Sequence, residues 1–104
     1  MKLKELQLEA LNKFGGTSNV VGTLNNPSKA EIGQILLSEV TFNSPPLVIR
    51  VTDKPKNCSN SLQSLYSIPA LVIFDGMKEL DVGDTCDIEF DEEYTTFTIL
   101  KEIK

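Results

Sequence analysis

The clearest fold signal in the chain lies at residues 85–90, which read TCDIEF. Charged and apolar side chains alternate along this stretch, which places Asp87 and Glu89 on the opposite face from the residues between them. The other face carries Cys86, Ile88 and Phe90. A period of two is typical of a β-strand with one face in the core and the other in water. The segment therefore predicts a half-buried strand.

Outward from this segment, β-branched and apolar residues predict further strands at 19–24, 35–42, 47–52, 69–74 and 94–103. Residues 29–39 leave a short helix open as an alternative to the start of the strand at 35–42. Turn-forming residues separate these segments at 25–28, 44–46 and 80–84, and residues 91–93 predict a hairpin. Residues 53–67 are rich in Lys, Asn, Ser and Pro, so we expect a long loop there, either functional or mobile.

The N-terminal region has a different periodicity. Residues 2–14 carry apolar side chains at spacings of three and four, a pattern that predicts an amphipathic helix. Gly15 and Gly16 follow and would end it, because glycine accepts the left-handed conformation of a helix C-cap. We expect one domain over residues 1–104, with a helical segment at 1–16 and a β domain at 17–104. The predicted fold class is mainly β, a small antiparallel β-barrel or sandwich of about five strands with one N-terminal helix.

The composition argues against catalysis. The chain contains no histidine, which is the commonest general acid–base group and a frequent zinc ligand. Its two cysteines, Cys58 and Cys86, are far apart in the sequence and form no CxxC pair. The acidic residues at 81–91 do not follow the spacing of an EF-hand loop. We therefore expect no enzyme activity, no cofactor and no metal site.

Charge is distributed unevenly along the chain, whose net charge is -5. Residues 57–74 carry no charge, whereas residues 75–93 carry nine acids and one base, for a net charge of -8. Two interpretations of this acidic block remain open. It is either the solvated side of a β-hairpin or one face of a polar assembly whose opposite face is mildly basic. Because Arg50 is the only arginine and the balance is acidic, we expect no sequence-specific binding of nucleic acid.

The sequence also bears on location. No stretch approaches the ~20 consecutive apolar residues that span a bilayer. Residues 1–14 are charged throughout and lack the uninterrupted apolar run of a signal peptide. We therefore expect no membrane partner, a cytosolic location and reduced thiols.

The C-terminal half resembles the head–tail joining, or head-completion, proteins of long-tailed bacteriophages. The resemblance rests on the apolar strand at 69–74, the turn with Gly83 and Asp84, the strand at 85–90, and a short turn carrying Tyr94 before the last strand. Upstream, residues 22–27 (GTLNNP) are similar to the family's first strand and turn, with asparagines where acids are common. The predicted helix ahead of this turn also fits the family, whereas the long loop at 53–67 is a departure.

The resemblance implies a non-catalytic virion assembly protein in the phage neck, between head and tail. Its expected partners are the neck proteins on the connector and tail sides and further copies of this chain. The protein would be a monomer in solution that forms a ring on the particle through heterologous contacts. Its expected location is the host cytoplasm during assembly and then the virion. An acidic face toward the channel would repel DNA and let it slide.

The residues expected at a partner interface lie in the first turn and in the long loop. They are Asn25, Asn26, Lys54, Lys56 and Tyr66. For the two lysines, simple solvation remains the alternative to binding. Two other functions remain open: a non-catalytic β-barrel adaptor that binds a protein partner, and a tail-terminator-like component.

Overall fold

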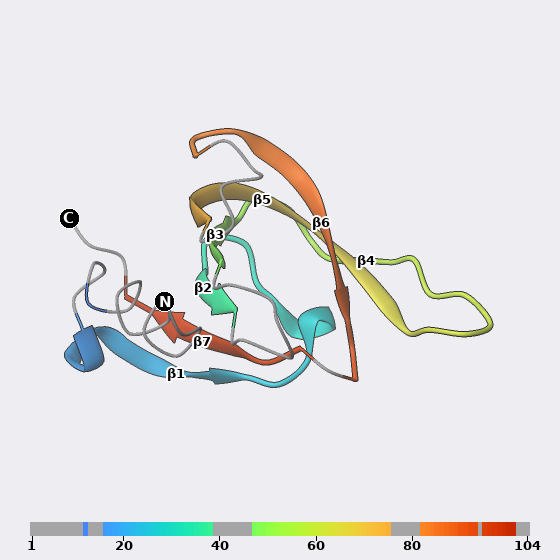
Figure 1. The fold of residues 1–104 in the computed structure, drawn as a ribbon, viewed down its shortest axis with the longest axis horizontal. Helices are drawn as coiled ribbons and strands as arrows, with labels where there is room; N and C mark the ends of the chain where they lie inside the picture. Colours follow the sequence, from blue (N-terminus) through green and yellow to red (C-terminus); the bar gives the residue numbers. More distant parts are fainter. Residues whose placement is uncertain (1–11, 13–15, 39–46, 76–81, 94, 102–104) are drawn as a thin grey trace.

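A computed structural model describes residues 12, 16–38, 47–75, 82–93 and 95–101, and these form one curved antiparallel sheet (Figure 1). The strands are β1 (Val20–Leu24), β2 (Ile35–Ser38), β3 (Leu47–Val51), β4 (Lys56–Asn57), β5 (Leu65–Asp75), β6 (Thr85–Asp91) and β7 (Phe97–Leu100). Two short 3-10 turns, η1 (Gly16–Asn19) and η2 (Pro27–Lys29), flank β1. The mainly β, antiparallel prediction is confirmed.

The sheet is not a closed barrel, so that part of the fold prediction is wrong. The strand order is β1-β7-β2-β3-β5-β4, and β6 pairs with the other side of β5. Within the described residues, β1 pairs only with β7 and β6 only with β5, so the two outer edges do not join. Figure 1 shows β1 and β6 diverging from a shared corner. A side-chain bond fixes that corner, where Asn26 Nδ2 after β1 donates to Glu92 Oε1 after β6 at 2.9 Å.

The hairpin predicted at 91–93 is also wrong, because β6 and β7 are not paired. Strand β6 pairs with β5, whereas β7 lies between β1 and β2. The chain instead passes from β6, which lies beside β5, to β7, which lies between β1 and β2. The rings of Phe90 in β6 and Phe97 in β7 meet edge to face, with centroids 4.9 Å apart. Side-chain packing, rather than a ladder of backbone hydrogen bonds, therefore joins the two strands.

The long loop expected at 53–67 is largely a hairpin. Strand β4 pairs with β5 through Lys56 opposite Ser67 and Asn57 opposite Tyr66, and β5 begins at Leu65, earlier than predicted. Beyond β4, the same side of β5 pairs with β3, and its other side pairs with β6. Strand β5 thus pairs with three other strands, β3, β4 and β6.

Two predictions reach beyond the described residues. The helix expected over 2–14 is not confirmed, because those residues other than Asn12 lie outside the part of the chain that the structure describes. The strand expected at 35–42 is confirmed as far as Ser38, and residues 39–42 lie outside the described part. At 80–84, the described end of the turn holds Gly83 with a φ of 95°, a conformation that favours glycine.

The core occupies both faces of the central strands. On one side of the sheet, β2, β3, β5, β7 and the C-cap residue of η2 supply a cluster of fully or nearly fully buried side chains: Ala30, Leu36, Ile49, Val51, Ile68, Ala70 and Phe97. On the opposite side of the sheet a second cluster contains Ile35, Leu37, Val48 and Leu100. Burial on both faces explains why β2 and β3 read as continuous apolar runs rather than as alternating strands.

Candidate functional site

The most prominent surface feature is the hairpin of β4 and β5, whose tip projects from the body of the sheet (Figure 1). Leu62 stands at this tip with 90% of its surface exposed. Its turn is fixed from within, because Asn60 Oδ1 accepts hydrogen bonds from the backbone N–H groups of Leu62 at 2.8 Å and Gln63 at 2.9 Å. Asn60 N–H also donates to the Gln63 carbonyl at 2.9 Å. The tip is therefore an organised turn that holds an apolar side chain in water.

Side chains behind the turn add to its order. Ser59 Oγ accepts from the backbone N–H of Leu65 at 2.9 Å, and Ser59 N–H donates to Asn57 Oδ1 at 2.9 Å. The Cys58 N–H donates to the Leu65 carbonyl at 2.9 Å. These bonds extend the β4–β5 pairing toward the tip, although β4 itself has only two residues.

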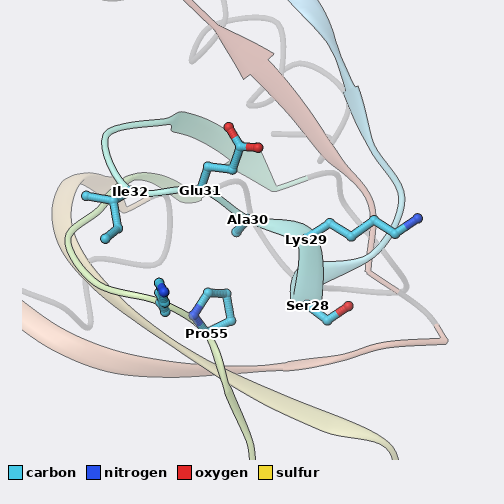
Figure 2. Close-up of a pocket in the computed structure, with 7 residues that line it drawn as sticks. Ser28, Lys29, Ala30, Glu31, Ile32 and Pro55 are labelled. Atoms are coloured by element: carbon cyan, nitrogen blue, oxygen red, sulfur yellow. The ribbon is translucent and has the colours of Figure 1, made fainter.

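A hollow of about 480 Å³ lies at the base of this hairpin (Figure 2). It is lined by Ser28, Lys29, Ala30, Glu31, Ile32, Lys54 and Pro55. Figure 2 shows Ala30, Ile32 and Pro55 bordering one space, while the charged ends of Lys29 and Glu31 extend away from it. The hollow thus has an apolar lining with charges at its rim.

The backbone that shapes the hollow is held by its neighbours. Asn26 caps η2, and its Oδ1 accepts from Ser28 N–H at 2.9 Å. Glu31 N–H donates to Gln34 Oε1 at 2.8 Å, and Gln34 N–H donates back to the Glu31 carbonyl at 3.1 Å. This closed turn leaves Ile32 59% exposed. Ile32 is therefore presented by a fixed turn, as Leu62 is.

The five predicted interface residues do not form one patch. Lys54 lines the hollow, and Asn26 supports it through the η2 cap. Asn25 is exposed beside that cap, whereas Lys56 and the half-buried Tyr66 lie along the hairpin. Two exposed apolar residues at the tip and the hollow, Leu62 and Ile32, were not among the predicted residues. The signal for both was an isolated large apolar side chain within a polar loop.

The acidic block forms a separate surface. Strand β6 alternates as predicted, with Asp87 and Glu89 exposed and Ile88 and Phe90 facing the core cluster. A smaller hollow of about 380 Å³ beside it is lined by Thr52, Asp53, Pro69, Ala70, Thr85, Cys86 and Asp87. Cys86 is half-buried rather than fully buried, and burial raises the pKa of its thiol, with Asp87 and Asp84 adding to the effect.

Within the described ranges, no group of three or more Cys, Asp or Glu side chains is placed to hold a metal ion. No helix in the described part of the chain is long and apolar enough to cross a membrane. No family model matches the chain, and no curated protein or solved structure is significantly similar to it.

Proposed function

We propose that this chain is a structural virion assembly protein that joins the head to the tail of a long-tailed bacteriophage as a component of a neck ring. The observation that carries the proposal is that the two sides of β5 present different surfaces. Strand β6 presents Asp87 and Glu89 on one side of β5, and the hairpin, which carries no charge over 57–67, projects on the other. A subunit of a ring around DNA needs one surface for the channel and others for its neighbours.

The acidic surface is proposed to face the channel. Carboxylates on β6 and in the following turn would repel the phosphates of passing DNA and prevent it from binding. The resemblance at Gly83, Asp84 and the strand that follows them also supports this part of the proposal, because these residues lead into β6. A neck reconstruction with Asp87 and Glu89 on the outer surface would contradict it.

Electron microscopy of particles from a strain that lacks the gene tests the joining role. The expected result is DNA-filled heads without attached tails, restored to whole virions when the gene is supplied in trans. Normal tailed particles would overturn the proposal. Heads joined to tails of abnormal length would point to a tail-terminator-like component instead.

One observation favours a second candidate, a non-catalytic adaptor for a protein partner. The apolar hollow near Ile32 and Pro55 is large enough to receive a partner's side chain. Genes for portal, capsid and tail proteins beside this one would favour the neck protein, and a neighbourhood without them would favour the adaptor.

A further inference from the structure

Each copy of the chain carries an exposed apolar knob and an apolar hollow. The knob is Leu62 at the hairpin tip, and the hollow is the space lined by Ala30, Ile32, Pro55 and their neighbours. Since Leu62 is 90% exposed, it does not fill the hollow of its own chain. Figure 1 shows the tip projecting away from the η2 turn that borders the hollow.

We propose that the Leu62 tip of one copy inserts into the Ala30–Ile32–Pro55 hollow of the next copy. This contact deepens the proposed neck ring and rests on that proposal. It is heterologous, because the tip and the hollow are different surfaces of the same chain. Repeated head to tail, such a contact generates a ring when the rotation between copies closes.

The order of both surfaces supports this pairing. The Asn60 hydrogen bonds fix the turn that presents Leu62, and the Glu31–Gln34 bonds fix the turn that presents Ile32. Because the backbone of both turns is already ordered, little backbone freedom is lost when the two apolar side chains meet. Removing an apolar side chain from water is favourable, so covering the side chain that this ordered turn exposes stabilises the contact.

Charge also favours a second copy as the occupant. The hairpin tip belongs to the segment 57–74, which has no charged residue, so its insertion desolvates no charge. The charged residues of the hollow are two bases, Lys29 and Lys54, and one acid, Glu31, whose net charge of one does not oppose a neutral tip. The acidic β6 of a neighbour would repel another β6, whereas the tip and the hollow do not repel each other.

The contact is small, because one leucine side chain carries most of it. An interface of this size does not hold a stable oligomer in dilute solution. It becomes effective where copies are held close together, as on a particle that docks each of them. The inference therefore agrees with the prediction of a monomer in solution.

Site-directed disulfide capture on the purified chain tests the contact. In a background with Cys58→Ser and Cys86→Ala, Leu62→Cys is mixed with Ile32→Cys, one of them carrying a size tag, and the mixture is oxidised with diamide. We expect the mixed disulfide dimer to exceed its statistical proportion relative to the two homodimers. The matched control replaces Ile32→Cys with Val82→Cys, another exposed apolar position, and should give only the statistical proportion.

Any other distribution overturns the contact. A statistical mixture with Ile32→Cys means that the tip does not select the hollow, and an excess of Leu62→Cys homodimer means that tips pair with each other.

A second experiment, which needs no cysteine variants, follows backbone amide shifts by NMR as the wild-type concentration rises. Shifts at Ile32 and Lys54 should occur in the wild type and in Val82→Asp, and be lost in Leu62→Asp. Equal shifts in Leu62→Asp would also overturn the contact.

The two proposals fail separately. Tailless heads in the deletion strain together with a statistical disulfide mixture would leave the neck role standing without this contact. Preferential capture together with normal virions would leave the contact standing without the neck role.

Discussion

Strand β5 separates two surfaces that meet water in opposite ways. On one side, the β4–β5 hairpin carries no charge over 57–67 and holds Leu62 in solvent. On the other side, β6 exposes Asp87 and Glu89 and keeps its apolar side chains inward. The same residues of β5, Tyr66 and Ser67, pair with both neighbours. At these two residues the two surfaces share the same backbone support and differ in their side chains.

The difference shows two ways to manage a free strand edge. Strand β6 is seven residues long and pairs only with β5 among the described residues, so its outer edge could recruit another strand. Carboxylates along it oppose that pairing. Strand β4 has only two residues, which leaves little edge to protect. The hairpin is therefore free to present an apolar group, whereas β6 is not.

The largest expected effect comes from removing the β7 side chain on which Phe90, from the inward side of β6, packs. Phe97→Ala removes a fully buried ring that packs edge to face on Phe90. We expect a loss of about 3–5 kcal/mol in the free energy of unfolding, measured by urea denaturation. Leu62→Ala on the hairpin should change it by no more than about 0.5 kcal/mol, because an exposed side chain contributes little to stability. Similar losses in the two variants would contradict the comparison.

A smaller effect is expected where the two outer strands meet. Asn26→Ala removes the η2 cap and the bond to Glu92 Oε1 that links the end of β1 to the end of β6. The loss should be about 1–2 kcal/mol in the same measurement. Asn25→Ala next to it is the control and should cost far less, since Asn25 is exposed. In Glu92→Gln, which keeps the acceptor oxygen, most of the stability should remain.

The sequence predicted the strands better than their partners. Alternation and β-branched runs are local, and they located β1, β3, β6 and the middle of β5. The pairing of β6 with β5 rather than β7 is set by tertiary packing, including the Phe90–Phe97 contact, and leaves no local pattern. Because local patterns do not show which strands pair, the short turn between β6 and β7 was interpreted as a hairpin. The closed barrel was predicted wrongly for the same reason, since closure depends on which edge strands pair.

The candidate site was predicted only in part. Lys54 and Asn26 were identified from loop and turn composition, and the structure places both at or beside the hollow. Strand β4 was missed because two polar residues carry no periodicity, and its pairing depends on the ladder with β5. Ile32 and Leu62 were missed because a single apolar residue in a loop gives no periodic signal. Their exposure is visible only in three dimensions.

The two cysteines allow a chemical test of the same comparison. Cys58 is exposed on the hairpin, whereas Cys86 on β6 is half-buried and its pKa is raised by burial and by the neighbouring carboxylates. A raised pKa means less of the reactive thiolate at neutral pH. We expect iodoacetamide to modify Cys58 before Cys86. Mass spectrometry of the peptides measures the modification of each cysteine over time. Modification of Cys86 should accelerate as pH rises toward its pKa, and equal rates throughout would contradict the difference.

The raised pKa of Cys86 also makes the free energy of unfolding fall as the pH becomes alkaline. Because the pKa of Cys86 is higher in the folded state, folding holds the proton more tightly. This contribution to the free energy of unfolding is complete below the pKa of Cys86 in the unfolded chain, and it is lost as pH rises through the pKa in the folded state. Cys86→Ala should therefore flatten the alkaline fall in the free energy of unfolding. Cys58→Ala is the control and should leave that fall unchanged.

The smallest effect on stability is expected on the outer side of β6. Asp87→Asn with Glu89→Gln should change the free energy of unfolding by no more than about 0.5 kcal/mol, because both side chains are exposed. The double variant should nevertheless self-associate, seen as light scattering that grows with concentration, since its edge has lost two opposing charges. Asp53→Asn with Glu93→Gln makes the same change in net charge at two exposed acids that are not part of the β6 strand. If both double variants associate equally, net charge rather than edge protection keeps the chains apart, and the contrast between β6 and the hairpin loses its physical basis.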